Sequence, residues 1–244
     1  MSLSFFIELF PQLVDATLVT IALWVLSSVF GNLLAIPVAI MRVSPRFLPR
    51  WSSRIFVTVI RGTPLLVQVY ILYYGLGNLL ARMPLVRTSI VWPLLRDGFW
   101  YAFAALTISA AAYSGEILRG GIEGVPRGEI EAGRSLGLSR WHIWRLIVLP
   151  RAIRIALPSL GGQTINLLKS TALASTITVM DVLGTANYIR MQTFRVYEPL
   201  LAASIIYVAL TLLFTRLLAR IERPAQRFGD PSKAGRTSSV ESSV

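Results

Sequence analysis

Few side chains in this 244-residue sequence have the types and spacing that catalysis or metal binding requires. It contains no cysteine and a single histidine, His142, which excludes thiol chemistry, Cys-ligated metals and metal sites built on several histidines. The acidic residues are scattered, so no carboxylate dyad or nucleophile–base pair is recognisable, and no Gly-x-x-x-x-Gly-Lys-Ser/Thr phosphate-binding loop occurs. We therefore expect no catalytic residues, no metal site and no cofactor in this chain.

Three charged residues, Arg61, Glu116 and Lys169, lie inside or at the edge of long apolar segments. A charged group in the bilayer costs at least ~2.5–3.5 kcal/mol on insertion scales, so each requires a partner or water. For Arg61 we favour a structural role, anchoring a helix break at which Thr63 caps and Pro64 starts the next helix. Glu116 has two open interpretations, a satisfied carboxylate at the membrane interface or a substrate contact.

Lys169 is the deepest of the three charges. It follows Arg154 by 15 residues, about 22 Å along a continuous helix. Its polar neighbours either line a translocation path or form hydrogen bonds between helices. A cationic substrate would be repelled by Lys169, so a substrate with additional carboxylates suits it better. The candidate path residues are Glu116, Asn166, Lys169, Ser170, Thr171 and, further along the chain, Asp181.

The segment 125–145 is too polar to cross a membrane but is strongly patterned. Gly137 can end one short helix, and Ser139 can cap the next. Two short helices of this kind suit a docking element for a cytoplasmic partner; the alternative is an amphipathic helix on the lipid surface with its arginines near phosphates. Three small residues would let a partner backbone approach closely, namely Ala132, Gly133 and Gly137.

The composition indicates the elements that must position these groups. Hydrophobic residues make up 54% of the chain and charged residues only 15%, against roughly a quarter in soluble domains. Segments of about 20 apolar residues span a bilayer, and helices satisfy their own backbone there. We therefore predict an all-α integral membrane protein with five transmembrane helices, near 13–41, 55–80, 98–118, 153–177 and 199–219.

Charge placement predicts the orientation of these helices. Of the 24 Lys and Arg residues, 17 lie in the first loop, from Arg119 to Arg154 in and just after the coupling loop 119–152, or from Arg216 onward, and the positive-inside rule places these regions in the cytoplasm. The N-terminus is then periplasmic and the C-terminus cytoplasmic, and the net charge of +12 reflects topology rather than nucleic-acid binding. Residues 1–222 form the membrane domain, and we expect the polar tail 223–244 to be disordered.

Several motifs resemble a known family. Glu131-Ala132-Gly133-x-x-x-Gly137, followed by Ile147-x-Leu149-Pro150, resembles the EAA loop of ABC-importer permeases, with Gly133 replacing the usual alanine. Arg61-Gly62-Thr63-Pro64 resembles the hallmark of the polar amino acid uptake subfamily. The segment 170–174 and Asp181-Val182-Leu183 most resemble the M-type subunit of histidine, lysine-arginine-ornithine and opine (octopine, nopaline) importers. The resemblance covers residues 13–222.

The resemblance implies a type I ABC-importer permease in a bacterial inner membrane. Such a subunit pairs with a second permease, usually a Q-type homologue, and works with a periplasmic substrate-binding protein and a cytoplasmic ATPase dimer, which binds ATP and Mg²⁺. The EAA loop would dock on the ATPase and make the helices rock, and the coupling residues are Glu131, Ala132, Gly133, Gly137, Leu149 and Pro150. The alternatives are a secondary transporter, normally longer and built from inverted repeats, and an intramembrane enzyme.

Overall fold

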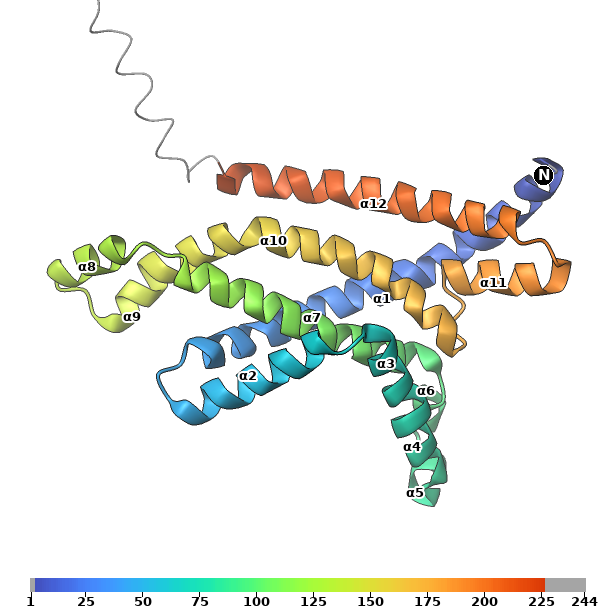
Figure 1. Ribbon diagram of the computed structural model, residues 1–244, viewed down its shortest axis with the longest axis horizontal. Helices are drawn as coiled ribbons and strands as arrows, with labels where there is room; N and C mark the ends of the chain where they lie inside the picture. Colours follow the sequence, from blue (N-terminus) through green and yellow to red (C-terminus); the bar gives the residue numbers. More distant parts are fainter. Residues whose placement is uncertain (1–2, 227–244) are drawn as a thin grey trace, which may run out of the picture.

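The computed structural model describes residues 3–226, and every regular element in that range is helical (Figure 1). The longest helices are α1 (Leu3–Val43), α7 (Gly98–Glu123), α10 (Leu149–Ser170) and α12 (Tyr197–Gln226). The tail was predicted to be disordered from residue 223, but α12 continues to Gln226. Residues 227–244 lie outside the described range. The other elements are α2 (Phe47–Gly62), α3 (Leu65–Tyr70), π-helix η1 (Ile71–Gly77), α4 (Asn78–Arg82), α5 (Pro84–Arg87), α6 (Trp92–Leu95), α8 (Arg127–Ser135), α9 (Arg140–Ile143), π-helix η2 (Trp144–Val148), 3-10 helix η3 (Thr171–Ile177) and α11 (Val182–Thr193).

Two segments within residues 3–226 are long and apolar enough to cross a membrane as straight helices, Glu8–Val43 and Tyr197–Arg220. A third candidate consists of Phe47–Gly62 and Leu65–Arg82, which meet at a bend of 103°. The helices α7 and α10 have 26 and 22 residues, so they are long enough to cross a membrane. They are too polar or carry too many charged residues to qualify by the same measure. The five-span topology therefore stays a prediction.

The second predicted span, 55–80, is broken at Thr63 and Pro64. Thr63 was expected to cap the helix that follows, and that expectation is wrong: its Oγ1 donates to the carbonyl of Val59, so the side chain closes the end of α2. Pro64 occupies the cap position of α3 without a side-chain hydrogen bond. The corner is instead closed by Gln68, whose Nε2 donates to the carbonyl of Ile60 at 2.7 Å.

The helices α1, α7 and α10 form the frame of the fold (Figure 1). Their backbones approach so closely that a Cβ added at Gly31 in α1 would lie 2.4 Å from Cβ of Ala110 in α7. A Cβ at Gly121 in α7 would lie 2.6 Å from the backbone oxygen of Ala152 in α10. Small residues at helix contacts permit such packing in lipid, so the small residues of α7 hold both neighbours at close range.

The end of the fourth predicted span turns sharply. The α-helical geometry of α10 tightens into η3, and Thr178 adopts a left-handed conformation at φ 70°. Asp181 then caps α11, which packs against α12 in the following hairpin (Figure 1). No helix was predicted at α11, because its hydrophobic residues are too few and too mixed with polar ones to indicate a span.

Candidate coupling elbow and transport path

The patterned loop folds into a two-helix elbow, residues 125–148, which we call the coupling elbow. Gly137 follows α8 with φ +75°, a conformation that glycine adopts without a Cβ penalty. Its N–H donates to the carbonyl of Arg134, and the N–H of Leu138 donates to the carbonyl of Gly133, which is the Schellman pattern of helix ends. The prediction that Gly137 ends a short helix is confirmed.

The second arm of the elbow is α9, which continues through η2 into α10 without an intervening loop. Ser139 caps it, with its Oγ accepting from the backbone N–H of His142 and lying 2.8 Å from Nδ1 of the same residue. This confirms the predicted cap. An ion pair of 3.0 Å between Glu129 and Arg151 fastens α8 to the start of α10.

The coupling elbow has a small hydrophobic core of its own. Its buried members are Val125, Ile143, Val148 and Ala152, and the core sits where α7 and α10 converge. Gly133 faces this core: a Cβ there would lie 2.7 Å from Cδ1 of Ile147. Gly133 therefore faces the elbow's own core and not, as its place in the motif suggested, an approaching partner.

The outer face of the elbow combines small and large apolar residues. Glu131, Ala132 and Gly137 are exposed, and Gly137 has no heavy atom of the chain within 4 Å of a Cβ placed on it. Leu136 and Trp141 are 81% and 69% exposed, so two large apolar side chains of the elbow are open to contact. Leu149 and Pro150, at the start of α10, are also exposed.

The predicted path residues divide into an exposed and a buried set. Asn166 and Lys169 project from α10 on its exposed side, and Ser170 is half-buried beside them, its hydroxyl donating to the carbonyl of Asn166. Thr171 and Asp181, by contrast, are both fully buried. The structure therefore brings Asn166, Lys169 and Ser170 onto one side of α10 and leaves the other two inside the protein.

Asp181 belongs to a polar network that connects three helices. Its Oδ1 accepts from the N–H of Gly184 at 2.8 Å, and its Oδ2 accepts from the hydroxyl of Tyr207 in α12 at 2.9 Å. Nearby, the hydroxyl of Thr20 in α1 accepts from the N–H of Val182 at 3.1 Å. Asp181 was predicted as a candidate site residue, but Thr20 and Tyr207 were not, because nothing in a single sequence pairs residues so far apart.

Glu116 and Arg61 have partners on other helices. Glu116 accepts from Arg119, one turn along α7, and from Arg42 at the end of α1. Arg61 places its guanidinium 5.0 Å from the ring centroid of Tyr113, a cation–π contact between α2 and α7. The segment from Arg61 to Pro64 is otherwise exposed.

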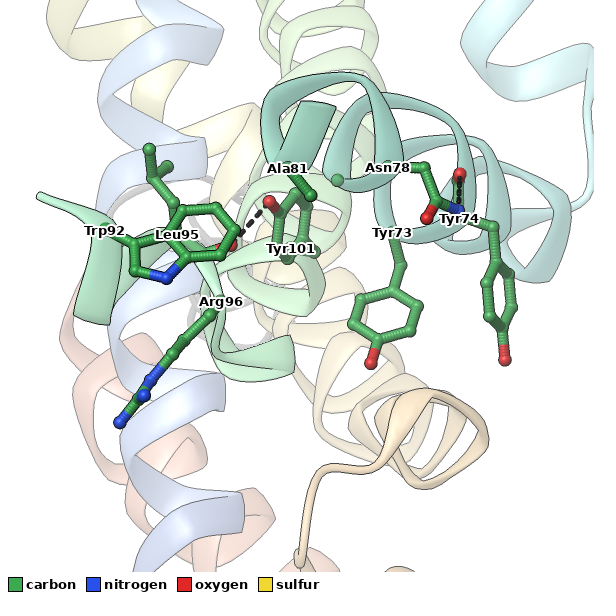
Figure 2. Close-up of a pocket in the computed structure, with 9 residues that line it drawn as sticks. Tyr73, Tyr74, Asn78, Ala81, Trp92, Leu95, Arg96 and Tyr101 are labelled. Atoms are coloured by element: carbon green, nitrogen blue, oxygen red, sulfur yellow. Dashed lines mark hydrogen bonds between the residues drawn. The ribbon is translucent and has the colours of Figure 1, made fainter. Parts of the chain in front are cut away.

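An aromatic pocket of about 290 Å³ lies beside the amino end of α7 (Figure 2). Its rings come from Tyr73, Tyr74, Trp92 and Tyr101. The hydroxyl of Tyr101 donates to the backbone of Leu95, and Figure 2 shows the side chain of Arg96 extending away from the rings. The pocket therefore lacks the convergent polar groups that orient a small ligand.

The fold and the elbow define a membrane permease, and comparison with known families supports this. A profile described as "Binding-protein-dependent transport system inner membrane component" matches residues 31–226. The chain belongs to this family. Its members are transport permeases rather than enzymes and work with separate ATPase and binding-protein partners.

The chain is similar to several characterised permeases. It is 42% identical over 215 residues to the octopine transport system permease protein OccM of Rhizobium meliloti, covering 88% of this chain and 86% of the relative. It is 38% identical over 222 residues to the nopaline permease NocM of Agrobacterium fabrum, covering 91% of each. It is 39% identical over 208 residues to the histidine/lysine/arginine/ornithine permease HisM of Salmonella typhimurium, covering 84% of this chain and 87% of the relative.

Solved structures show the same fold. A chain from the crystal structure of an amino acid ABC transporter with histidines superposes with a TM-score of 0.81 at 32% identity, covering 92% of this chain and 99% of that one. A chain of the MetNI methionine ABC transporter superposes with a TM-score of 0.70 at 20% identity and supports the fold alone.

Proposed function

We propose that this chain is the M-type permease subunit of an ATP-driven importer that moves a polar or basic amino acid, or an opine, from the periplasm to the cytoplasm. The observation that carries the proposal is the coupling elbow. It packs on its own core, is joined directly to α7 and α10, and exposes small and apolar residues on its outer face. Such a unit can transmit a movement of an ATPase to both helices without unfolding itself.

The orientation follows from the same element. With the elbow in the cytoplasm, 17 of the 24 Lys and Arg residues lie on the cytoplasmic side, as the positive-inside rule requires. Five spans then place the N-terminus in the periplasm of a bacterial inner membrane and the C-terminus in the cytoplasm. Arginines of the elbow that do not contact the ATPase lie within reach of lipid phosphates.

The transport path of this proposal runs along the exposed side of α10. An exposed lysine at membrane depth is costly against lipid, so Lys169 and Asn166 must face a second subunit or water. The second subunit is a Q-type homologue in a heterodimer, and the path lies between the two. Glu116, Thr171 and Asp181 have structural roles, since their polar groups form hydrogen bonds or ion pairs within the chain.

The central test is uptake by the reconstituted importer, with its ATPase and binding protein, in proteoliposomes. A Gly137→Asp variant is informative because the site has free space and aspartate tolerates left-handed backbone better than most residues. We expect normal membrane insertion but ATP hydrolysis uncoupled from uptake. Ser52→Asp, on the exposed part of α2, is the matched control. Normal uptake by Gly137→Asp would count strongly against docking through the elbow.

The substrate class is tested at Lys169. We expect Lys169→Ala to reduce octopine uptake more than arginine uptake, because octopine carries an additional carboxylate that an ammonium group attracts. Equal losses for the two substrates would remove Lys169 from substrate selection.

A substrate gradient that drives uptake without any ATPase would instead support a secondary transporter.

A further inference from the structure

Four charged side chains join α1 to α7 at the ends nearest the coupling elbow. Glu116 is the centre of the cluster. Its Oε2 accepts from Nε and Nη2 of Arg42 at 3.2 and 2.9 Å, and its Oε1 accepts from Nε and Nη2 of Arg119 at 3.0 and 2.8 Å. Arg119 also pairs with Glu123, one turn further along α7. Each carboxylate oxygen of Glu116 is thus held by the fork of a different arginine.

Three of the four side chains in the cluster are shielded from solvent, whereas Glu123 is 57% exposed. The side chains of Arg42, Glu116 and Arg119 are only 16%, 19% and 25% exposed. Charge-assisted forks of this kind are among the stronger hydrogen bonds, and they are screened less when partly buried. Without the Glu116 carboxylate, Arg42 would face Arg119 across the helix contact, and the remaining carboxylate, Glu123, would compensate only Arg119.

The cluster fixes the position of α1 along α7, which the contacts between small residues do not. Elsewhere along the two helices, α1 contacts α7 where Gly31 meets Ala110 and where Val38 meets Gly115. A Cβ added to Gly115 would lie 2.7 Å from Cγ1 of Val38. Contacts between small apolar groups bring helices together but resist sliding only weakly. A carboxylate held by two planar forks has one geometry, so it fixes how far α1 lies along α7.

We propose that Glu116 is a positioning residue that clamps α1 to α7, so that α1 follows when the coupling elbow moves. The inference rests on the proposed function, in which the ATPase pushes on α8. The push reaches α7 directly, because α7 leads into α8 through residues 124–126. The clamp carries it to Arg42 and therefore to α1, which is not adjacent in the chain to the elbow.

The first test uses Glu116→Gln, which keeps the size of the side chain and removes its charge. In the reconstituted importer we expect ATP hydrolysis to continue and the uptake per ATP hydrolysed to fall about tenfold, a size within the range by which single residues modulate coupling. Arg42→Gln should give the same defect, and the double variant should be no worse than either single one. Arg54→Gln, which removes one charge from the exposed side of α2, should leave the ratio unchanged.

A covalent replacement separates clamping from any other role of the charge. The chain has no cysteine, and Cβ of Val38 lies 3.1 Å from a Cβ built on Gly115, which is shorter than the roughly 3.5–4.5 Å of disulfides, so the helices need to separate by only a few tenths of an ångström to admit the bond. Oxidising a Val38→Cys/Gly115→Cys pair in the Glu116→Gln background should restore the uptake per ATP, and reduction should abolish it again. An oxidised cross-link that restores nothing would overturn the proposal, as would a normal ratio in Glu116→Gln.

A measurement on the permease alone keeps the clamp testable without transport. Spin labels at Ile40 and Gly120, both exposed, report the distance between the two helix ends. We expect a narrow distribution in the parent chain and a broad one in Glu116→Gln. An unchanged distribution would overturn the clamp. Absence of ATP-dependent uptake by the parent importer would instead contradict the proposed function.

Discussion

Two neighbouring glycines near the end of α7 offer a sharp test of how the frame is packed. Gly121 faces α10: a Cβ on it would lie 2.6 Å from the backbone oxygen of Ala152 and 3.0 Å from Cβ of Ala156. Gly120, one residue earlier, has no heavy atom within 4 Å of an added Cβ. Substituting alanine at either position makes the same chemical change in the same helical turn.

The magnitudes follow from this geometry. Both substitutions gain helix propensity, about 0.8–1 kcal/mol for Gly to Ala in a helix interior. Only Gly121→Ala overpacks a contact, and since the nearest atom is backbone it cannot simply rotate away; overpacking costs roughly 1–3 kcal/mol. The propensity gain is common to both, so the difference in stability between the variants equals the overpacking cost. For a chain of this size each kcal/mol corresponds to about 2–4 °C in Tm.

Thermal unfolding of the purified permease in detergent measures this difference. We expect Gly120→Ala to unfold a few degrees above the parent chain and Gly121→Ala to unfold below Gly120→Ala by on the order of 2–12 °C. We also expect Gly121→Ala to weaken coupling, because α7 and α10 are the two helices that carry the elbow. Equal Tm values for the two variants would refute the close contact between α7 and α10.

Three further outcomes follow from individual contacts. Tyr207→Phe should lower the free energy of unfolding by about 1–3 kcal/mol, measured by thermal unfolding, because Asp181 loses a buried donor. The control is Tyr197→Phe: Tyr197 is 75% exposed, so its substitution should leave the Tm unchanged. Gly137→Val should cost roughly 1–2 kcal/mol at the end of α8, because valine resists positive φ, and should reduce co-purification of the ATPase more than Gly137→Asn does. Trp24→Phe should cost about 1 kcal/mol in thermal unfolding, because Nε1 donates to the carbonyl of Thr164 at 2.8 Å.

The features that sequence analysis predicted well are local. Gly137 as a helix end and Ser139 as a cap depend on a few neighbouring residues, and the structure has both. The membrane class followed from composition, and the permease family followed from the spacing of Glu131, Gly137, Leu149 and Pro150. These signals are contained in short segments or in averages over the chain.

The features that it missed depend on residues far apart in the chain. Arg42 lies 74 positions from Glu116, and nothing in a single sequence indicates that they meet. The inward direction of Gly133 was hidden for the same reason, since Ile147 fills the space only once the elbow has folded. The bend of 103° after Gly62 was predicted as a break, but the role of Gln68 in closing it was not.

Docking of the coupling elbow on a cytoplasmic ATPase is tested by the accessibility of a single cysteine at Ala132, on the outer face of the elbow. The parent chain has no cysteine, so a membrane-impermeant maleimide reports this site alone. We expect labelling in inside-out membrane vesicles, none in right-side-out vesicles, and protection when the ATPase is bound. Labelling from the periplasmic side, or labelling that the ATPase does not affect, would contradict it.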